Sequence, residues 1–209
     1  MEISSNLPFP PIAQPRRIPQ SANDGVELVE DGEIVGGRDG RAGGTWLACT
    51  KDGKVAFVTN VREIPSHSQV KSRGDLPIRF LKSQKSPKEF AEELVAEADQ
   101  YNGFNLIVAD LCSMTMLYIT NRPKDDGPSI TEVAPGIHVL SNAKLDTPWP
   151  KAQRLRQSFE DVVQKCCDAE ISMEEITEKL MTDTTKDDDE QELLSFILLP
   201  LSTFECHFC

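Results

Sequence analysis

Short apolar runs bounded by polar residues occupy two neighbouring segments, residues 45–50 and 54–60. Such runs are typical of β-strands. Asp52 and Gly53 stand between the two segments and form a dipeptide that favours a tight hairpin turn. We therefore expect a β-hairpin whose core-facing side chains are Trp46, Leu47, Ala48, Val55 and Phe57.

Four later segments have the same strand-like character. Residues 104–111 are almost entirely apolar, and residues 115–120 follow them after a short polar turn. Residues 130–133 and 137–140 flank a Pro-Gly dipeptide at 135–136, so they predict a second hairpin. Short connections of this kind favour antiparallel pairing of the strands.

A helix between the strands is marked by its own start signals. Ser86 is a suitable N-cap, Pro87 is a suitable first residue, and Glu89 completes a capping box with Ser86. Apolar residues then recur at helical spacing as far as an Asn-Gly pair at 102–103. We expect the helix to end at this pair.

The chain turns helical again beyond residue 150, and Ser172 with Glu175 predicts a further capping box. The order of hairpin, helix, strand pair, hairpin and helices predicts an α+β fold with antiparallel sheets. We divide the chain into a disordered leader at residues 1–30, a folded domain at 31–185, and an acidic segment with a divergent tail at 186–209.

Composition narrows the classes of partner. The chain has 209 residues and a net charge of −12, and so acidic a surface repels the phosphates of nucleic acids. No stretch approaches the ~20 apolar residues that span a bilayer. The N-terminal segment lacks the basic start and apolar centre of a secretory signal. We therefore expect a cytoplasmic protein with no nucleic-acid partner and no transmembrane segment.

Two motif-like segments lack the context that their chemistry requires. The glycine-rich residues 36–44 lead into a strand, so the helix N-terminus that binds phosphate in nucleotide-binding loops is missing. The C-x-x-C pair of Cys206 and Cys209 has only His207 beside it, whereas a zinc site needs about four ligands. We favour a structural loop and a plain tail, and expect no metal site and no catalytic residue.

Asparagines stand at or beside the ends of the expected strands. A side-chain amide in such a place can stabilise an oxyanion, although it more often closes a turn. We favour the structural role, closing a turn or capping a strand, for each asparagine, and keep Asn60 and Asn142 as candidate ligand or oxyanion-site residues. The asparagines concerned are Asn60, Asn102, Asn105, Asn121 and Asn142.

Five blocks of sequence follow one another in a fixed order: IVGGRDG from Ile34, GGTWL from Gly43, FVTNVRE from Phe57, YNGFNL from Tyr101 and LSNAKLDTPWPK from Leu140. Together they resemble the transport and Golgi organisation 2 homologues, an NRDE-type family named for an Asn-Arg-Asp-Glu motif. The similarity extends from about residue 31 to about residue 181. Its signature residues are Gly43, Gly44, Thr45, Trp46, Asn102, Gly103, Asn105, Ser141, Pro148 and Trp149.

The resemblance also implies what belongs at the two ends. Family members begin with Met-Cys, a strand and the Asn-Arg-Asp-Glu motif, and continue with strands after the acidic helix. This chain begins Met1-Glu2 and stops at Cys209, so we expect a product truncated at both ends. The family fold is thought to resemble the αββα sandwich of the N-terminal-nucleophile hydrolases, and we expect an incomplete form of it here.

In those hydrolases the first residue of the mature chain is the nucleophile, and the family's cysteine after Met would take that place. Glu2 has neither a thiol nor a hydroxyl, so the resemblance implies a non-catalytic chain. It also implies that Thr59 with Asn60, and Ser141 with Asn142, lie near the oxyanion site and serve at most to bind.

The function that the resemblance implies is a role in Golgi organisation and protein secretion, with protein partners in secretory traffic. A carrier of haem or of a lipid such as an acyl-CoA is one alternative. An amide hydrolase, in a full-length form with cysteine at position two, is another. We expect no cofactor and keep haem as a candidate ligand. The cytoplasm is the expected location, with the Golgi and the mitochondrion as the organelles that the resemblance implies.

Overall fold

A large antiparallel sheet organises the molecule. The computed structural model describes residues 27–29, 33–40, 43–61, 71–165, 173–182, 185 and 197–200. Seven strands pair in chain order, each antiparallel to the next. They are β1 (Glu27–Val29), β2 (Ile34–Gly36), β3 (Leu47–Thr50), β4 (Lys54–Asn60), β5 (Phe104–Asp110), β6 (Thr115–Thr120) and β7 (Ser129–Glu132).

The central strands lie where the sequence predicts them. β4 and β6 have the predicted bounds, and β5 ends one residue earlier than expected. β3 and β4 form the first predicted hairpin, but Cys49 pairs with Val55 and Gly53 has φ +88°. The loop therefore holds three residues ending in a left-handed glycine, whereas the sequence predicted a two-residue turn.

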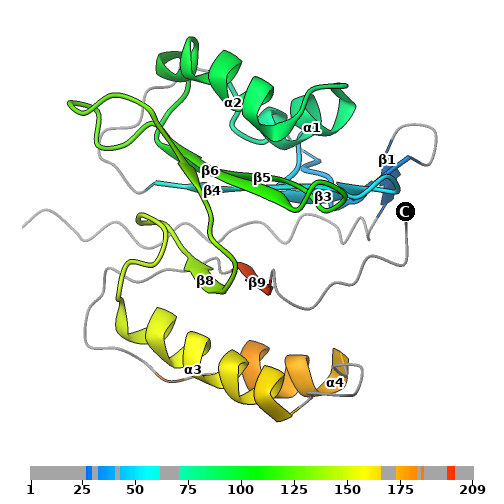
Figure 1. Ribbon diagram of the computed structural model, residues 1–209, viewed down its shortest axis with the longest axis vertical. Coiled ribbons are helices and arrows are strands. Elements are labelled where there is room, and N and C mark those ends of the chain that lie inside the picture. Colours follow the sequence, from blue (N-terminus) through cyan, green and yellow to red (C-terminus); the bar gives the residue numbers. More distant parts are fainter. Residues whose placement is uncertain are drawn as a thin grey trace, which may run out of the picture.

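Two helices cover one face of this sheet, as Figure 1 shows: α1 (Asp75–Lys82) and α2 (Pro87–Val95), followed by the 3₁₀ helix η1 (Ala98–Gln100). The predicted capping box is confirmed, because the Ser86 side chain accepts from the backbone N–H of Glu89 and the Glu89 side chain accepts from that of Ser86. α2 ends at Val95, earlier than the predicted Asn-Gly pair at 102–103.

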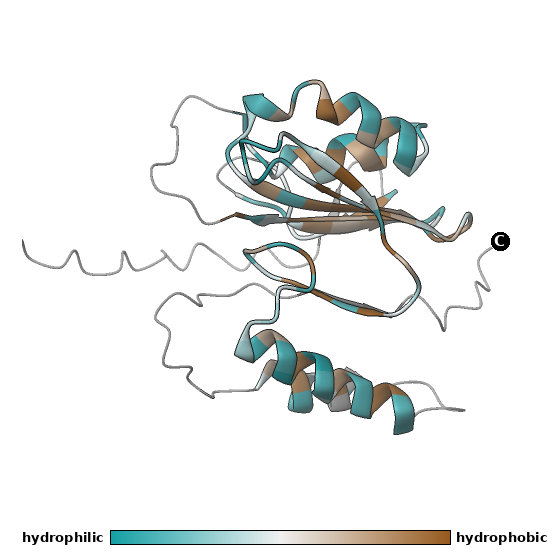
Figure 2. Ribbon diagram, turned by 60° about the vertical axis from the view of Figure 1, so that its left-hand side comes forward, coloured by the Kyte–Doolittle hydropathy of each residue, from teal (hydrophilic) through white to brown (hydrophobic). Residues whose placement is uncertain are grey.

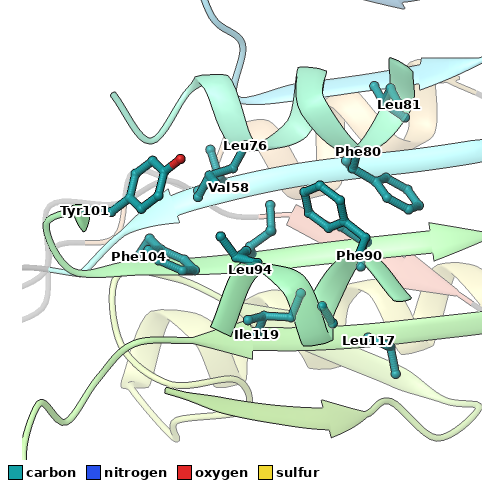
Figure 3. Close-up of a cluster of buried hydrophobic side chains, with 14 of the residues drawn as sticks. Val58, Leu76, Phe80, Leu81, Phe90, Leu94, Tyr101, Phe104, Leu117 and Ile119 are labelled. Carbon is teal, nitrogen blue, oxygen red and sulfur yellow. The ribbon is translucent and has the colours of Figure 1, made fainter. Parts of the chain in front are cut away.

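Strand alternation divides the buried apolar side chains into two clusters. The larger cluster lies between the sheet and the two helices, where Phe80 of α1 and Phe90 of α2 meet edge to face with ring centroids 5.3 Å apart (Figure 3). The smaller cluster lies on the opposite face. Its members are Phe57, Ile107, Ala109, Met116, Tyr118, Val133 and Leu140.

A second, two-stranded sheet faces this smaller cluster: β8 (Ile137–Leu140) pairs antiparallel with β9 (Ile197–Pro200). Beyond it lie α3 (Pro150–Lys165), α4 (Met173–Ile176) and the π-helical η2 (Thr177–Met181) (Figure 1). The described elements thus form four layers in the order helices, sheet, sheet, helices. This is the layer order that the resemblance implied, and the α+β class with an antiparallel sheet is confirmed.

The prediction of a second hairpin, formed by residues 130–133 and 137–140, is wrong. β7 pairs with β6 in the large sheet, whereas β8 pairs with β9 in the small one. Residues 133–136 carry the chain from one sheet to the other, since the backbone N–H of Val133 still donates to Met116 before Gly136 turns at φ +151°. The Pro-Gly dipeptide therefore marks a crossing between layers.

Two further expectations need correction. Trp46 and Leu47 are about half exposed, at 53% and 47%, and do not belong to the core. β1 falls inside the segment predicted as leader, so the sheet begins earlier than expected. The remainder of the leader, the Ser172 capping box and the Cys206–Cys209 tail lie outside the described residues.

Hydrophobic residues are concentrated in the strands of the two sheets, which lie between the helical layers, while the helices carry many hydrophilic residues (Figure 2). No helix among the residues described above has both the length and the apolar character needed to cross a membrane.

Candidate functional site

Several signature blocks meet at one end of the large sheet. β4 ends there and β5 begins there, since Asn60 is opposite Phe104. β6 ends there too, because Thr120 is opposite Asn105. The chain entering β3 also lies at this end, where the Trp46 carbonyl accepts from the backbone N–H of Val58. We call this region the polar end, and its core comprises Thr59, Asn60, Asn105, Tyr118, Ser141 and Asn142.

Asn105 lies at the centre of the polar end and is fully buried. Its side-chain Oδ1 accepts a hydrogen bond of 2.8 Å from the Tyr118 hydroxyl. Its Nδ2 donates to the Ala143 carbonyl at 2.7 Å and makes longer contacts with Thr59 Oγ1 (3.3 Å) and the Ser141 carbonyl (3.4 Å). An amide buried on an apolar sheet face requires such partners. Asn105 therefore joins three strands to the loop that follows β8.

The loop after β8, residues 141–145, is held to the sheet by two further bonds. The Thr59 hydroxyl donates to the Ser141 carbonyl at 2.7 Å, and the Asn142 Nδ2 donates to the Asn60 carbonyl at 2.6 Å. The structure therefore brings Asn60 and Asn142 together, as neighbours that connect the two sheets. The Asn60 side chain is exposed and that of Asn142 is half-buried.

The Ser141 hydroxyl differs from the other polar groups of the polar end in its hydrogen bonding. Ser141 is 5% exposed, and its Oγ has no hydrogen-bond partner among the residues that the structure describes. A buried unpaired hydroxyl costs about 1–3 kcal/mol.

Tyr118 donates to Asn105 in its protonated form. Burial raises the pKa of the phenol, and hydrogen bonding with Thr120 and the Leu145 backbone opposes that rise only in part. The phenol therefore stays protonated at neutral pH and remains a donor to Asn105.

Asn121 supports the polar end from the helical side of the sheet. Its Oδ1 accepts from the backbone N–H of Phe104 at 2.9 Å, and its Nδ2 donates to the Ala98 carbonyl at 2.9 Å. Longer contacts reach the carbonyls of Tyr101 and Asn102. Asn121 therefore fixes the connection from η1 into β5, which is the structural reading expected of a strand-end asparagine.

The other signature residues have mainly structural positions. Gly44 packs so closely against Gly74 that an added Cβ would lie 2.5 Å from the Gly74 carbonyl carbon, and the Thr45 N–H donates to the Gly74 carbonyl. Gly43 turns with φ +72°, and Gly103 accepts from Arg73 at 2.9 Å. Pro148 and Trp149 lie at the entry to α3.

Sequence reasoning missed two parts of the site. The sequence around Tyr118 indicates only an aromatic residue in a strand. Its hydrogen bond to Asn105 depends on the fold, so no local pattern predicts it. The contact of His138 with Asp146, at 2.7 Å between Nδ1 and Oδ2, closes the base of the loop after β8 and also went unpredicted. Within the described ranges, no group of three or more His, Cys, Asp or Glu side chains could hold a metal ion.

The geometry defines a class: an α+β protein of stacked antiparallel sheets with a buried amide network at one end. The model of the family described as Transport and Golgi organisation 2 matches residues 22–203, and the chain belongs to this family. The chain is 37% identical over 139 residues to the Transport and Golgi organization protein 2 homolog of Bos taurus, and 37% identical over the same length to that of Homo sapiens. The Mus musculus homolog is 35% identical over 139 residues.

Each alignment covers 64% of this chain and 49% of the relative. The chain thus spans about half the length of the curated relatives that it matches.

Proposed function

We propose that this chain serves Golgi organisation and protein secretion as a non-catalytic binding member of its family, and that it binds through the exposed part of the polar end, at Asn60 and Asn142. The names of the three mammalian relatives support the cellular role. The hydrogen bonding of the polar end supports the mode of action. The location in the cytoplasm, with association to the Golgi, is part of the same proposal.

The observation that carries the proposal is the use of the amides at the polar end. Catalytic oxyanion donors are preorganised toward a substrate atom. Here the Nδ2 of Asn105 and that of Asn142 donate to the protein's own carbonyls, at Ala143 and Asn60. Both amides therefore hold the second sheet on the first. The exposed Asn60 side chain beside Asn142 is left to contact a polar partner.

The apolar space between the sheets does not favour the carrier alternative. The cavity lined by Phe57, Ile107 and Leu140, among others, has a volume of about 10 Å³. Sites for small organic ligands have volumes of roughly 300–1,000 Å³. A haem or an acyl chain has no room in this cavity, so a carrier role would need a different binding place.

Re-expression in cells lacking their endogenous family member tests the proposal, with secretion of a reporter protein and Golgi morphology as readouts. We expect the wild-type chain to restore secretion and Asn142→Asp to restore it less well. Gln153→Glu, which makes the same amide-to-carboxylate change at an exposed position of α3, should behave as wild type. Failure of the wild-type chain to restore secretion would contradict the cellular role.

The non-catalytic part has its own test. The purified chain is incubated with a panel of amide substrates, and we expect no turnover. Turnover that disappears in Asn142→Asp, while the melting temperature of that variant stays unchanged, would overturn this part of the proposal.

A further inference from the structure

The loop that completes the polar end is closed at its base by one residue. The backbone N–H of Asp146 donates to the Val139 carbonyl at 2.9 Å, and Asp146 Oδ1 accepts from the Val139 N–H at 3.0 Å. Asp146 has φ +58°, in the left-handed region that aspartate tolerates better than most residues. Residues 141–145 therefore project as a closed loop from β8.

This loop carries the contacts that complete the candidate site. The Ser141 and Ala143 carbonyls accept from Thr59 and Asn105, and Asn142 donates to Asn60. The place of Asn142 on the protein surface is therefore set by how firmly the base of the loop is held.

His138 holds that base through both of its ring nitrogens. Nδ1 lies 2.7 Å from Asp146 Oδ2, and Nε2 lies 2.9 Å from the Ala134 carbonyl oxygen. An ionised carboxylate and a carbonyl oxygen can only accept. Both contacts are hydrogen bonds only when both ring nitrogens carry a proton, which is the positively charged form. A neutral imidazole has one N–H and satisfies one of the two.

The large-sheet side chains that line the space beside His138 are apolar, and the charges near it come from α3 and from its own loop. From α3, Arg156 places Nη2 3.9 Å from Asp146 Oδ1 and Nε 3.5 Å from Glu160, and it also donates to the Ile137 carbonyl. The crossing segment 133–136 and β9, which pairs with β8, contain no titratable residue. Arg156 contacts Asp146 independently of His138, so the base of the loop keeps this contact when His138 is neutral.

We propose that His138 is a protonation-dependent positioning residue for the candidate site. In its charged form it binds the crossing segment and Asp146 together and holds the loop 141–145 against the large sheet. Histidine side chains change charge between roughly pH 5 and 8. Loss of this charge from His138 breaks one of the two contacts and loosens the loop, so Asn142 is held less firmly beside Asn60.

Amide hydrogen exchange of the purified full chain measures this hold without any secretion assay. The backbone N–H groups of Val139 and Asp146 are the direct reporters, and their rates at pH 5.5 and pH 8 are divided by the intrinsic rates at those pH values. We expect protection in the wild-type chain to be about fivefold to tenfold greater at the lower pH, as the loss of one hydrogen bond predicts. In His138→Gln, whose side chain carries no charge, this dependence should disappear.

His67→Gln is the matched control, because it removes a histidine elsewhere and should keep the wild-type dependence. Asp146→Asn is a second variant that keeps an acceptor for Val139 and tolerates the left-handed backbone, so it remains informative if His138→Gln does not fold. It too should lose the pH dependence. Equal protection at both pH values in the wild type, or a dependence that persists in both variants, would overturn the inference. The inference rests on the proposed function only for its consequence in binding, and since the assay uses purified protein, either idea can fail without the other.

Discussion

Asn105 is the residue on which the polar end depends most. It contributes one side chain to the large sheet, yet it contacts β4, β6 and the loop after β8. A buried amide is stable only while its donors and acceptor are all used. The removal of this side chain therefore affects every partner at once.

Asn105→Ala should destabilise the protein by about 2–4 kcal/mol, because the Tyr118 hydroxyl and the Ala143 carbonyl would both lose a buried partner. Urea unfolding measures the difference. Asn60→Ala is the matched control at an exposed position, and it should change stability by no more than about 0.5 kcal/mol. Equal unfolding midpoints for the two variants would show that Asn105 does not connect the layers.

Removing the hydroxyl of Ser141 and removing that of Thr59 should have opposite effects on stability, although both belong to the same network. Ser141→Ala removes a buried hydroxyl that has no described partner, so stability should be unchanged or higher by up to about 1 kcal/mol. Thr59→Val keeps the shape but loses the donor to the Ser141 carbonyl, at a cost of about 1–2 kcal/mol. Thermal melts of both proteins decide the matter, and the reverse order would contradict the assigned bonding.

For single residues, the sequence predicts where along the strands the asparagines lie better than it predicts what each side chain does. It places five asparagines at strand ends, but it does not distinguish Asn105, which is fully buried, from Asn60, which is exposed. That difference arises because the loop after β8 covers Asn105, and this loop is separated from it by more than thirty residues. The apolar run around Trp46 predicts a core position, but Trp46 precedes β3 and is about half exposed, because a local pattern does not show which side chains the fold covers.

At the scale of the elements, the carboxylate of Glu97 joins the two helices that cover the large sheet. Glu97, between α2 and η1, contacts Lys71 at 2.9 Å and also pairs with Arg79 of α1. Burial would raise the pKa of Glu97, but the hydrogen bonds and charges of Lys71 and Arg79 outweigh it and hold the pKa below its ordinary value of 4.5. Tyr101 joins the group by accepting from Arg79.

A depressed pKa makes a definite prediction about acid stability. The contribution of Glu97 is fully present above about pH 4.5 and is lost as the pH falls through the lower value of the folded state. Glu97→Gln should therefore lower stability at neutral pH and flatten its decline below about pH 4.5. Unfolding curves across this range measure both effects.

Glu92→Gln, which changes an exposed carboxylate on α2, is the control and should keep the wild-type slope. If Glu97→Gln and Glu92→Gln lose stability in parallel on acidification, Glu97 is not the group that fastens α1 to α2.

Elements defined by local signals are predicted well, and pairings that depend on distant partners are not. β4, β6 and the Ser86 capping box follow from short patterns that the fold leaves unchanged. The pairing of β8 does not, because its partner β9 lies almost sixty residues later. The short separation of β7 and β8 favoured a hairpin, but tertiary packing placed them in different sheets.

For the whole molecule, the four-layer order explains why the polar end is structurally important. The two apolar clusters lie on opposite faces of the large sheet, and β8 packs on that sheet through Leu140. At the polar end this apolar contact gives way to hydrogen bonds that join the two sheets. The resemblance to the N-terminal-nucleophile hydrolases themselves stays a prediction.

The central claim is that Asn105 and Asn142, on different layers, act as one unit that holds the second sheet on the first. A double-mutant cycle of Asn105→Ala and Asn142→Ala measures this directly as the coupling free energy of unfolding. We predict a coupling of about 0.5–1.5 kcal/mol, because once one anchor of the loop is lost the other stabilises less. Additive effects within about 0.3 kcal/mol would mean that the two asparagines act independently, and would contradict the account.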